Sequence, residues 1–353
     1  MQNIERMIKS VQEKVKSQEF MEKHKRSCKD FTRKRNLSFA EIMYFVIGNL
    51  GTSLDFEVMN FCFGREGTVS SAAISKARDK IKYSAFEEIF RESAVEIPVR
   101  HTYRGYRLTA YDGVKGELPK TKELLELSNG NGNGSYPQFH AMAEYDVLNC
   151  CYTNAVFEYG TIDERSAAMK LLEKHEYEGA EIFLLDRGFP SLAMIQQLER
   201  SGKHYLMRVT HSFLREVNDF VKSKAKDKVV EINYDSKRGS HVKGVELPYS
   251  FHLRCVKIEL ANGEEEILVT NLAKSEFTRK DIGELYCLRW KIETGFLHLK
   301  YAICIEDFMG VKANSIKQEF FASLFKSNLF MLFVEAANDI ICNKKNDKTR
   351  IQD

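Results

Sequence analysis

The chain has 353 residues, of which 43% are hydrophobic and 29% are charged, and its formal net charge at pH 7 is +3. This length allows two or three domains with a large buried core, and the composition is that of an ordinary globular protein. The sequence has no apolar run of the ~18 residues that a membrane span needs and no secretion-signal core, so we expect a cytoplasmic protein without a membrane partner. The eight cysteines form no CxxC pair and no zinc-like pairing with the nine histidines, which predicts reduced thiols.

Positive charge is concentrated near the N-terminus. Residues 1–40 contain eleven Lys and Arg against five Asp and Glu, so this segment carries +6 and the rest of the chain −3. Seven of these basic residues lie between Lys23 and Arg35, where Asp30 is the only acid. The excess indicates either a polyanion partner such as DNA or a solvated basic segment without a partner. The candidate DNA contacts are Lys25, Arg26, Arg33, Lys34 and Arg35.

Helical periodicity dominates the first 97 residues and predicts an all-helical N-terminal domain, residues 1–97. Ser38 followed three residues later by Glu41 is typical of a helix start, and Gly51 ends that helix. A helix of such a domain can dock in a DNA groove, although the sequence does not indicate which one. The predicted helices cover residues 4–22, 39–50, 55–63 and 68–93, the last stretch as one or two helices.

After Pro98 the pattern changes to strands. Residues 106–113 alternate and end with Asp112 and Gly113, and the apolar run 180–185 is followed at once by Asp186. The other predicted elements are a hairpin of strands 138–147 and 150–159, a strand at 204–209, and helices at 163–175 and 190–201. Three antiparallel strands followed by helix, strand, helix and strand is the element order of a ribonuclease-H-like α/β domain.

Residues 286–300 are predicted to form one helix with two stripes of different chemistry. The apolar stripe, which should be buried, consists of Leu285, Leu288, Ile292, Phe296 and Leu299. The second stripe consists of Tyr286, Arg289, Glu293 and Lys300. Such residues can form a site held against the protein body or a solvated face with i,i+4 ion pairs, and this helix alone does not decide between them.

Three carboxylates are expected to converge. In a ribonuclease-H-like sheet the strands that end in Asp112 and Asp186 are neighbours, and the helix that carries Glu293 packs beside them. Their mutual repulsion would require cations, and hard oxygen ligands suit Mg²⁺ or Mn²⁺. Two such ions ~4 Å apart can activate the attacking hydroxyl and stabilise the leaving oxygen in phosphodiester displacement.

The spacing Tyr-x2-Arg-x3-Glu-x6-Lys in residues 286–300 resembles the signature of bacterial insertion-sequence transposases of the DDE class, specifically the insertion-sequence-4 type. Asp112 lies in YDG and Asp186 opens DRGF, which resemble the first and second aspartates of that family. The stretch TIDERSAA, with Glu164, and the stretch HYLMR, residues 204–208, are also similar to family segments. Together the matches cover roughly residues 68–335.

This resemblance implies a ribonuclease-H-like catalytic domain, residues 98–210 and 276–313, with a mainly β insertion, residues 211–275. Strand candidates in the insertion are residues 228–234, 249–260 and 265–271. Residues 314–353 are expected to form C-terminal helices and a polar tail, with little room for a separate dimerisation domain.

The resemblance also implies the chemistry. Asp112, Asp186 and Glu293 would be catalytic and would bind two Mg²⁺ ions, with Mn²⁺ also supporting activity, while Tyr286, Arg289 and Lys300 would contact DNA. The implied partners are double-stranded DNA at the element's terminal inverted repeats, target DNA, and a second copy of the chain in a synaptic homodimer.

Some features depart from the family pattern or stay open. Leu297 stands where some related enzymes have a second lysine. Trp290 is expected to serve packing more than stacking on an unpaired base, and the run SNGNGNGS, residues 128–135, predicts a mobile connector. Two alternatives remain: a catalytically silent DNA-binding regulator derived from a transposase, and a metal-dependent nuclease without strand transfer.

Overall fold

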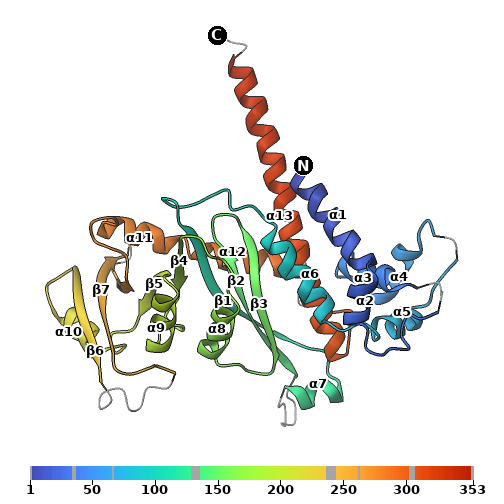
Figure 1. Ribbon diagram of the computed structural model, residues 1–353, viewed down its shortest axis with the longest axis horizontal. Coiled ribbons are helices and arrows are strands. Elements are labelled where there is room, and N and C mark those ends of the chain that lie inside the picture. Colours follow the sequence, from blue (N-terminus) through green and yellow to red (C-terminus); the bar gives the residue numbers. More distant parts are fainter. Residues whose placement is uncertain are drawn as a thin grey trace.

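The computed structural model describes residues 2–33, 37–65, 67–128, 136–235, 244–260, 263–301 and 307–350. An eight-stranded mixed sheet runs through the molecule in the order β3-β2-β1-β4-β5-β8-β7-β6 (Figure 1). Its strands are β1 (Arg107–Glu117), β2 (Gln138–Asp146), β3 (Cys151–Tyr159), β4 (Glu181–Leu185), β5 (His204–Val209), β6 (Asp227–Tyr234), β7 (Tyr249–Glu259) and β8 (Glu265–Thr270).

The first five strands have the predicted order. β1, β2 and β3 pair antiparallel, and β4 then pairs parallel with β1 on one side and with β5 on the other. The buried run of β4 lies between two neighbours, which explains why all five of its residues are buried. The predicted ribonuclease-H-like element order is therefore confirmed for this part of the sheet.

The three strands expected between residues 211 and 275 are present and extend the same sheet. β8 pairs antiparallel with β5, β7 pairs with β8, and β6 forms the far edge. The insertion thus continues the hydrogen-bonded ladder of the central strands. Its treatment as a subdomain, like the other domain boundaries, stays a prediction.

Helices cover both faces of the sheet. One face packs against α8 (Glu164–Glu173), α9 (Leu192–Arg200) and α10 (Arg215–Lys222), and the other against α6 (Ser84–Val95), α11 (Arg279–Cys287), α12 (Trp290–Tyr301) and α13 (Ala313–Arg350). Alternation along the strands separates the two apolar cores. Ala110 belongs to the α12 side and the next residue, Tyr111, belongs to the α8 side.

The residues before β1 form the helices α1 (Gln2–Lys16), α2 (Gln18–His24), α3 (Phe39–Ile47), α4 (Leu54–Cys62), α5 (Ser71–Arg78) and α6, and α7 (Lys122–Leu127) follows β1. The helix expected at residues 4–22 is two helices, because the Ser17 side chain caps α2 by accepting from the Phe20 N–H. Ser38 and Glu41 form the predicted capping box of α3. The apolar side chains of these helices share one core with the α12 face of the sheet.

α13 is a single helix that lies beside α1 and projects beyond the sheet (Figure 1). The expectation of several C-terminal helices and a polar tail from residue 343 is wrong, because the helix continues to Arg350. Residues 313–341 are long and apolar enough to cross a membrane by length and composition, a stretch that the sequence analysis missed. Half of its most apolar 18-residue stretch is buried inside the molecule.

Candidate active site

Asp112 and Asp186 occupy equivalent places on neighbouring strands. Ala110 on β1 is paired with Leu184 on β4, and each aspartate lies two residues further along its chain. Side chains two residues apart point to the same face of a sheet, and neighbouring strands are ~4.8 Å apart. Both carboxylates therefore lie toward the face that α12 covers, where Ala110, Leu184 and Ile292 share one core.

The pKa of Asp112 is affected by the other two predicted carboxylates, Asp186 and Glu293. Burial raises the pKa of Asp112 to about 6, and the nearby carboxylates of Glu293 and Asp186 act in the same direction. The Gly113 N–H, which donates to Asp112 Oδ1 (2.9 Å), and the Arg289 guanidinium act in the opposite direction. The charges of Asp186 and Glu293 thus both act on Asp112, while the catalytic role of these three carboxylates stays a prediction.

The predicted helix 286–300 is interrupted. α11 ends at Cys287, Leu288 and Arg289 form a turn, and α12 begins at Trp290. The N–H groups of Leu288 and Arg289 donate to the carbonyls three residues earlier, at Leu285 and Tyr286. Such a tight turn advances ~120° per residue instead of ~100°. The turn accordingly buries Arg289, which is 4% exposed, and leaves Leu288 only partly buried, contrary to its predicted place in the buried stripe.

Two of the four residues in the second stripe of the predicted helix, Tyr286 and Arg289, form hydrogen bonds with the predicted catalytic carboxylates. The Tyr286 hydroxyl donates to Asp186 Oδ1 (3.1 Å), and burial, together with Asp186, raises the pKa of this phenol so that it stays protonated. Arg289 Nη2 donates to Glu293 Oε1 (3.0 Å). Because Tyr286 and Arg289 are both buried, the solvated-face alternative is wrong for these two residues.

One buried donor atom of Arg289, its Nε, has no acceptor among the described residues. The Arg289 guanidinium lies 5.7 Å from the Tyr286 ring centre and 5.8 Å from that of Trp290. A buried charged donor without an acceptor is costly, so this N–H marks a place where a ligand oxygen would be stabilised.

Arg208 on β5 belongs to the same neighbourhood and was not predicted from the sequence. Its Nη1 lies 4.0 Å from Asp186 Oδ1 and 3.1 Å from Glu266 Oε1. The available signal was its place in HYLMR, on the strand that pairs with β4. Glu164, which lies in the family-like segment TIDERSAA, contacts Lys115 at 3.4 Å. Lys115 is three residues after Asp112 on β1, so its side chain points to the opposite face of the strand.

The three carboxylates offer oxygen ligands that suit Mg²⁺ or Mn²⁺. Burial raises the pKa of Asp112, and Glu293 and Asp186 act in the same direction, so a nearby cation would favour its ionised form. Among the described residues, however, no three His, Cys, Asp or Glu side chains are placed to hold an ion as they stand. The chemistry of the residues fits the metal, while Glu293 is engaged by Arg289 and Asp186 by Tyr286.

The N-terminal basic residues have different environments. Lys25 is 8% exposed and its ammonium donates to Glu22 (2.6 Å) and to the Cys28 carbonyl, so its predicted DNA contact is wrong for this arrangement. Arg26 and Arg33 are exposed. Lys34 and Arg35 lie outside the described residues, as do the 129–135 part of the predicted connector and the Lys300 side chain.

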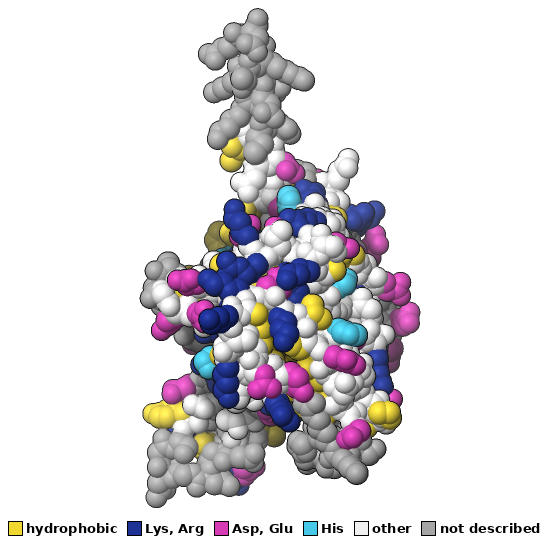
Figure 2. Space-filling model, turned by 90° about the vertical axis from the view of Figure 1, so that its left-hand side faces the viewer, with side chains coloured by type: hydrophobic (Ala, Val, Ile, Leu, Met, Phe, Trp, Pro, Cys, Tyr) yellow, Lys and Arg dark blue, Asp and Glu magenta, His cyan; other side chains and the backbone are white. Residues whose placement is uncertain are grey.

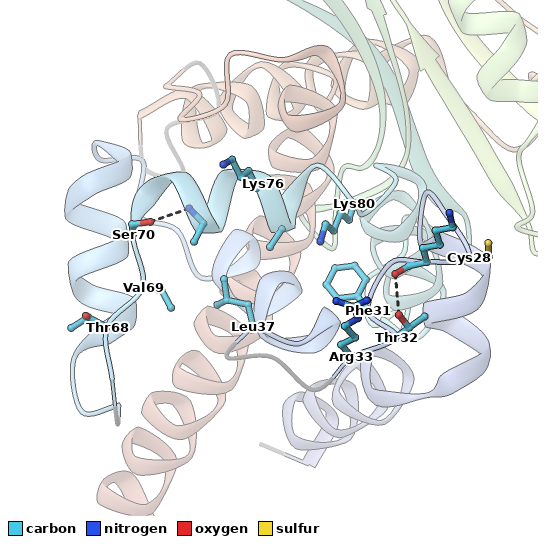
Figure 3. A pocket seen from close by; sticks show the side chains of 13 residues that line it. Cys28, Phe31, Thr32, Arg33, Leu37, Thr68, Val69, Ser70, Lys76 and Lys80 are labelled. Atoms are coloured by element: carbon cyan, nitrogen blue, oxygen red, sulfur yellow. Dashed lines mark hydrogen bonds between the residues drawn. The ribbon is translucent and has the colours of Figure 1, made fainter.

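Arg33 lines a cavity of about 850 Å³ between α5 and the segment that follows α2 (Figure 3). Lys29, Lys76 and Lys80 also line it. The Ser70 hydroxyl caps α5 at its rim by accepting from the Ala73 N–H, and the Thr32 hydroxyl donates to the Lys29 carbonyl, so both walls are ordered. Four cations meet here, and two of them, Lys76 in α5 and Lys80 just after it, come from a segment that the sequence did not single out.

Trp290 is 63% exposed, so the expectation that it serves packing is wrong. It begins α12 just before the turn of helix that carries Glu293. Leu297 is also exposed. An exposed tryptophan and leucine on the helix of the carboxylate group leave apolar surface open next to the site.

The domain is an α/β fold in which two aspartates lie in or just after adjacent strands and a glutamate lies on a helix packed against them. This arrangement is typical of transposase catalytic domains. Residues 103–329 match the family model described as the transposase DDE domain, and the chain belongs to that family. Within it, the chain is of the insertion-sequence-4 type. It is 22% identical over 277 residues to the transposase InsG for insertion sequence element IS4 of Escherichia coli (strain K12), a match that covers 75% of this chain.

The chain spans about three-fifths of that relative's length, 61%. Among solved structures, a piggyBac transposase in a synaptic complex with hairpin DNA, determined by cryo-electron microscopy, is similar with a TM-score of 0.52. That similarity covers 92% of this chain and 74% of the other, at 10% sequence identity, and it supports the fold. The eight-stranded sheet thus agrees with a ribonuclease-H-like transposase.

Proposed function

We propose that this protein is a DNA transposase that cleaves the ends of its insertion sequence and joins them to target DNA. The observation that carries the proposal is the coupled group of Asp112, Asp186 and Glu293 beside Arg289, whose buried Nε has no acceptor among the described residues. The carboxylates could hold cations, and the unpartnered N–H of Arg289 could donate to a phosphate oxygen, so the site suits a phosphodiester substrate. The family supports DNA breakage and joining as the reaction.

Asp112, Asp186 and Glu293 would hold two Mg²⁺ ions, or Mn²⁺ in their place. When bound, such ions supply Lewis-acid activation of the attacking hydroxyl and charge stabilisation of the leaving oxygen. The Tyr286 hydroxyl keeps Asp186 oriented through its hydrogen bond. Arg208 and Arg289 offset part of the negative charge of the carboxylates, and the bound cations would supply the rest, so that a phosphate could lie beside the group.

The chemistry consists of two displacements at phosphorus. In the first, a water oxygen forms a bond to phosphorus at the element end, the bond to the 3′ oxygen breaks, and that oxygen takes a proton. In the second, the freed 3′ hydroxyl attacks a target phosphodiester, loses its proton and displaces the target's 3′ oxygen. Arg289 Nε would donate to a non-bridging oxygen of the phosphate, where charge develops, and Lys300 would act on the same strand.

Recognition of the terminal inverted repeats is assigned to the N-terminal helices. Arg33 with Lys29, Lys76 and Lys80 forms a basic cavity that a DNA phosphate could enter, and Arg26 lies exposed nearby in the sequence. Two copies of the chain would hold two ends together before joining. These reactions would take place on the nucleoid in a bacterial cytoplasm.

The test is the cleavage of labelled end DNA by Asp112→Asn, Asp186→Asn and Glu293→Gln. Each variant should lose cleavage in Mg²⁺ and keep end binding nearly intact, because DNA affinity depends mainly on phosphate contacts. Glu158→Gln on β3, a partly exposed carboxylate paired with Lys170, serves as the matched control and should cut normally. A triad variant that cuts at more than about a tenth of the wild-type rate would remove that residue from the catalytic group.

The same reaction mixtures separate the alternatives. A nuclease would release cleaved ends but give no joined product with target DNA. A silent regulator would bind ends and cut in neither Mg²⁺ nor Mn²⁺. The joined product is the outcome that the proposal requires.

A further inference from the structure

Four exposed lysines occupy alternate positions where α10 passes into the edge strand β6. Lys222 ends the helix, Lys224 and Lys226 lie in the connecting segment, and Lys228 is in β6. The residues between them are partly buried. We call Lys222, Lys224, Lys226 and Lys228 the lysine row.

No acid neutralises the row. The only acidic residue within it, Asp227, is held by Arg254, whose Nε and Nη2 donate to its two oxygens at 3.0 and 2.9 Å. Lys274 also approaches Asp227, at 3.6 Å. Within the described residues, none of the four lysines forms an ion pair, so their repulsion is left uncompensated.

The backbone of the row is fixed by a fifth lysine, which is buried. Lys257 is 7% exposed, and its ammonium donates to the carbonyls of Val221 and Ser223, both at 2.8 Å. Its own N–H donates to the Lys226 carbonyl (2.9 Å), which extends the β6–β7 ladder beyond the strand. The row is therefore a preorganised surface and not a loose loop.

Protection of an open sheet edge does not explain the row. Lysines on edge strands do prevent pairing with other strands. Only Lys228 lies in β6, however, and the other three precede the strand. The row places an exposed lysine at every second residue from 222 to 228, so it concentrates positive charge on one short segment. The natural complement is the phosphate backbone of a nucleic acid.

The row lies beyond the carboxylate group along the sheet. Four strand-to-strand steps separate β4 from β6, which at ~4.8 Å each is ~19 Å. A DNA duplex rises ~3.4 Å per base pair, so this distance equals about six base pairs. The β6 end of the sheet is at the left of Figure 1 and faces the viewer in Figure 2, where Lys and Arg side chains gather in the middle of the face.

We infer that the lysine row is a second DNA-binding surface, which holds the duplex about six base pairs from the scissile phosphate. It is separate from the N-terminal cavity, and its function rests on the proposed DNA cleavage. Four phosphate contacts would hold the duplex beside the β6 edge of the sheet, on the side where α10 packs. The row therefore acts on positioning and affinity, and not on the chemical step.

The first test replaces all four lysines of the row by glutamine. The slope of log K against log salt for end or target duplex should fall by ~3.6, because each lost contact with B-DNA contributes ~0.9. The matched control replaces four exposed lysines elsewhere, Lys120, Lys122, Lys170 and Lys174, by glutamine. An equal fall in slope for row and control variants would overturn the inference, since it would show only an effect of net charge.

The second test separates DNA binding from edge protection. Lys224→Glu with Lys228→Glu keeps charge at the edge but repels phosphate, while the same positions changed to arginine keep the attraction. The inference expects at least ~10-fold weaker binding for the glutamate pair at low salt and near-normal binding for the arginine pair. Normal binding by a monodisperse glutamate pair would overturn it.

A third measurement uses wild-type protein and duplexes shortened from either side of the scissile bond. Affinity should drop when the duplex no longer reaches about six base pairs, and the side on which it drops tells whether the row holds element or flanking and target DNA. In the row variant this drop should be absent. If the wild type neither binds nor cuts any duplex, the proposed function itself fails, whereas unchanged behaviour of the row variant beside an active wild type rejects the lysine row alone.

Discussion

Asp112 should destabilise the folded protein when it is ionised. Its pKa of about 6, against the ordinary value of 3.8, reflects burial first and the neighbouring Glu293 and Asp186 next. At ~1.36 kcal/mol per pH unit, this difference corresponds to at most about 3 kcal/mol, since the side chain keeps some solvent contact. Replacement by asparagine removes the charge and retains an acceptor for the Gly113 N–H.

The sign follows from linkage. The folded state binds the proton of Asp112 more tightly than the unfolded state, so the penalty is absent below pH 3.8 and complete above about pH 6. In EDTA, Asp112→Asn should therefore exceed the wild type in free energy of unfolding by up to about 3 kcal/mol at pH 8, and the two should converge near pH 4.

Urea unfolding at pH 4, 6 and 8 measures this difference, with Asp219→Asn, at an exposed position of α10, as the control. Added Mg²⁺ should stabilise the wild type, because an ion that binds only the folded state shifts the equilibrium, and should stabilise Asp112→Asn less. Equal free energies of wild type and Asp112→Asn at pH 8 would refute the view that burial and the neighbouring carboxylates disfavour the ionised form of Asp112.

Three further predictions concern the neighbouring residues. Arg289→Ala should lower single-turnover cleavage by ~10²-fold with a smaller loss of end binding, and Arg289→Lys should restore only part of the rate; a normal rate per folded molecule would make Arg289 a structural ion-pair partner. Ile292→Ala should destabilise the protein by ~2–5 kcal/mol in urea unfolding, and Leu288→Ala by clearly less because it is only partly buried. Hydrogen bonds from His175 to Glu144 and Glu181 offset the burial of this imidazole and raise its pKa to about 9. The stability that its charge contributes should be complete below pH 6.5 and lost as pH rises through about 9, a dependence that His175→Gln should abolish in urea titrations.

The two aspartates were predictable because strand patterns are local. Alternation in β1 and the continuous apolar run of β4 identify both strands, and parallel neighbours bring their ends to one edge. Glu293 was identified by the resemblance of its Tyr-x2-Arg-x3-Glu-x6-Lys spacing to the transposase signature, since helical spacing alone left the solvated face open. The expected convergence of the three carboxylates therefore rests on strand patterns for the aspartates and on the family spacing for Glu293.

The turn at Leu288 and Arg289 was not predictable in this way. A helical wheel assumes ~100° per residue throughout, so it does not anticipate a local turn with a tighter advance. At this turn Arg289 is buried and Leu288 only partly buried, while Ile292 and Leu299 keep their predicted burial. Lys25 fails for a different reason, since its burial depends on the contacts of α2 and not on the basic composition of its segment.

The sequence contains the pattern of the lysine row, but the net charge of the whole segment does not reveal it. Residues 211–275 contain nearly as many acids as bases, so their net charge is small. The alternation of lysine from 222 to 228 is nevertheless written in the sequence, as VKSKAKDK. What the sequence lacks is the pairing of Asp227 with Arg254, which removes the one acid from the row.

The net charge around Asp112, Asp186 and Glu293 makes the binding of a DNA phosphate depend on the binding of metal ions. The three carboxylates and Glu266 face the two guanidiniums of Arg208 and Arg289, so the ionised group has a net charge of about −2 and would repel a DNA phosphate. The two divalent cations expected here would reverse that sign. One of them would also take over the Glu293 oxygen that Arg289 now contacts, and so free a second guanidinium donor beside the unpartnered Nε. Metal and phosphate should therefore bind cooperatively, each increasing the affinity for the other by the same factor.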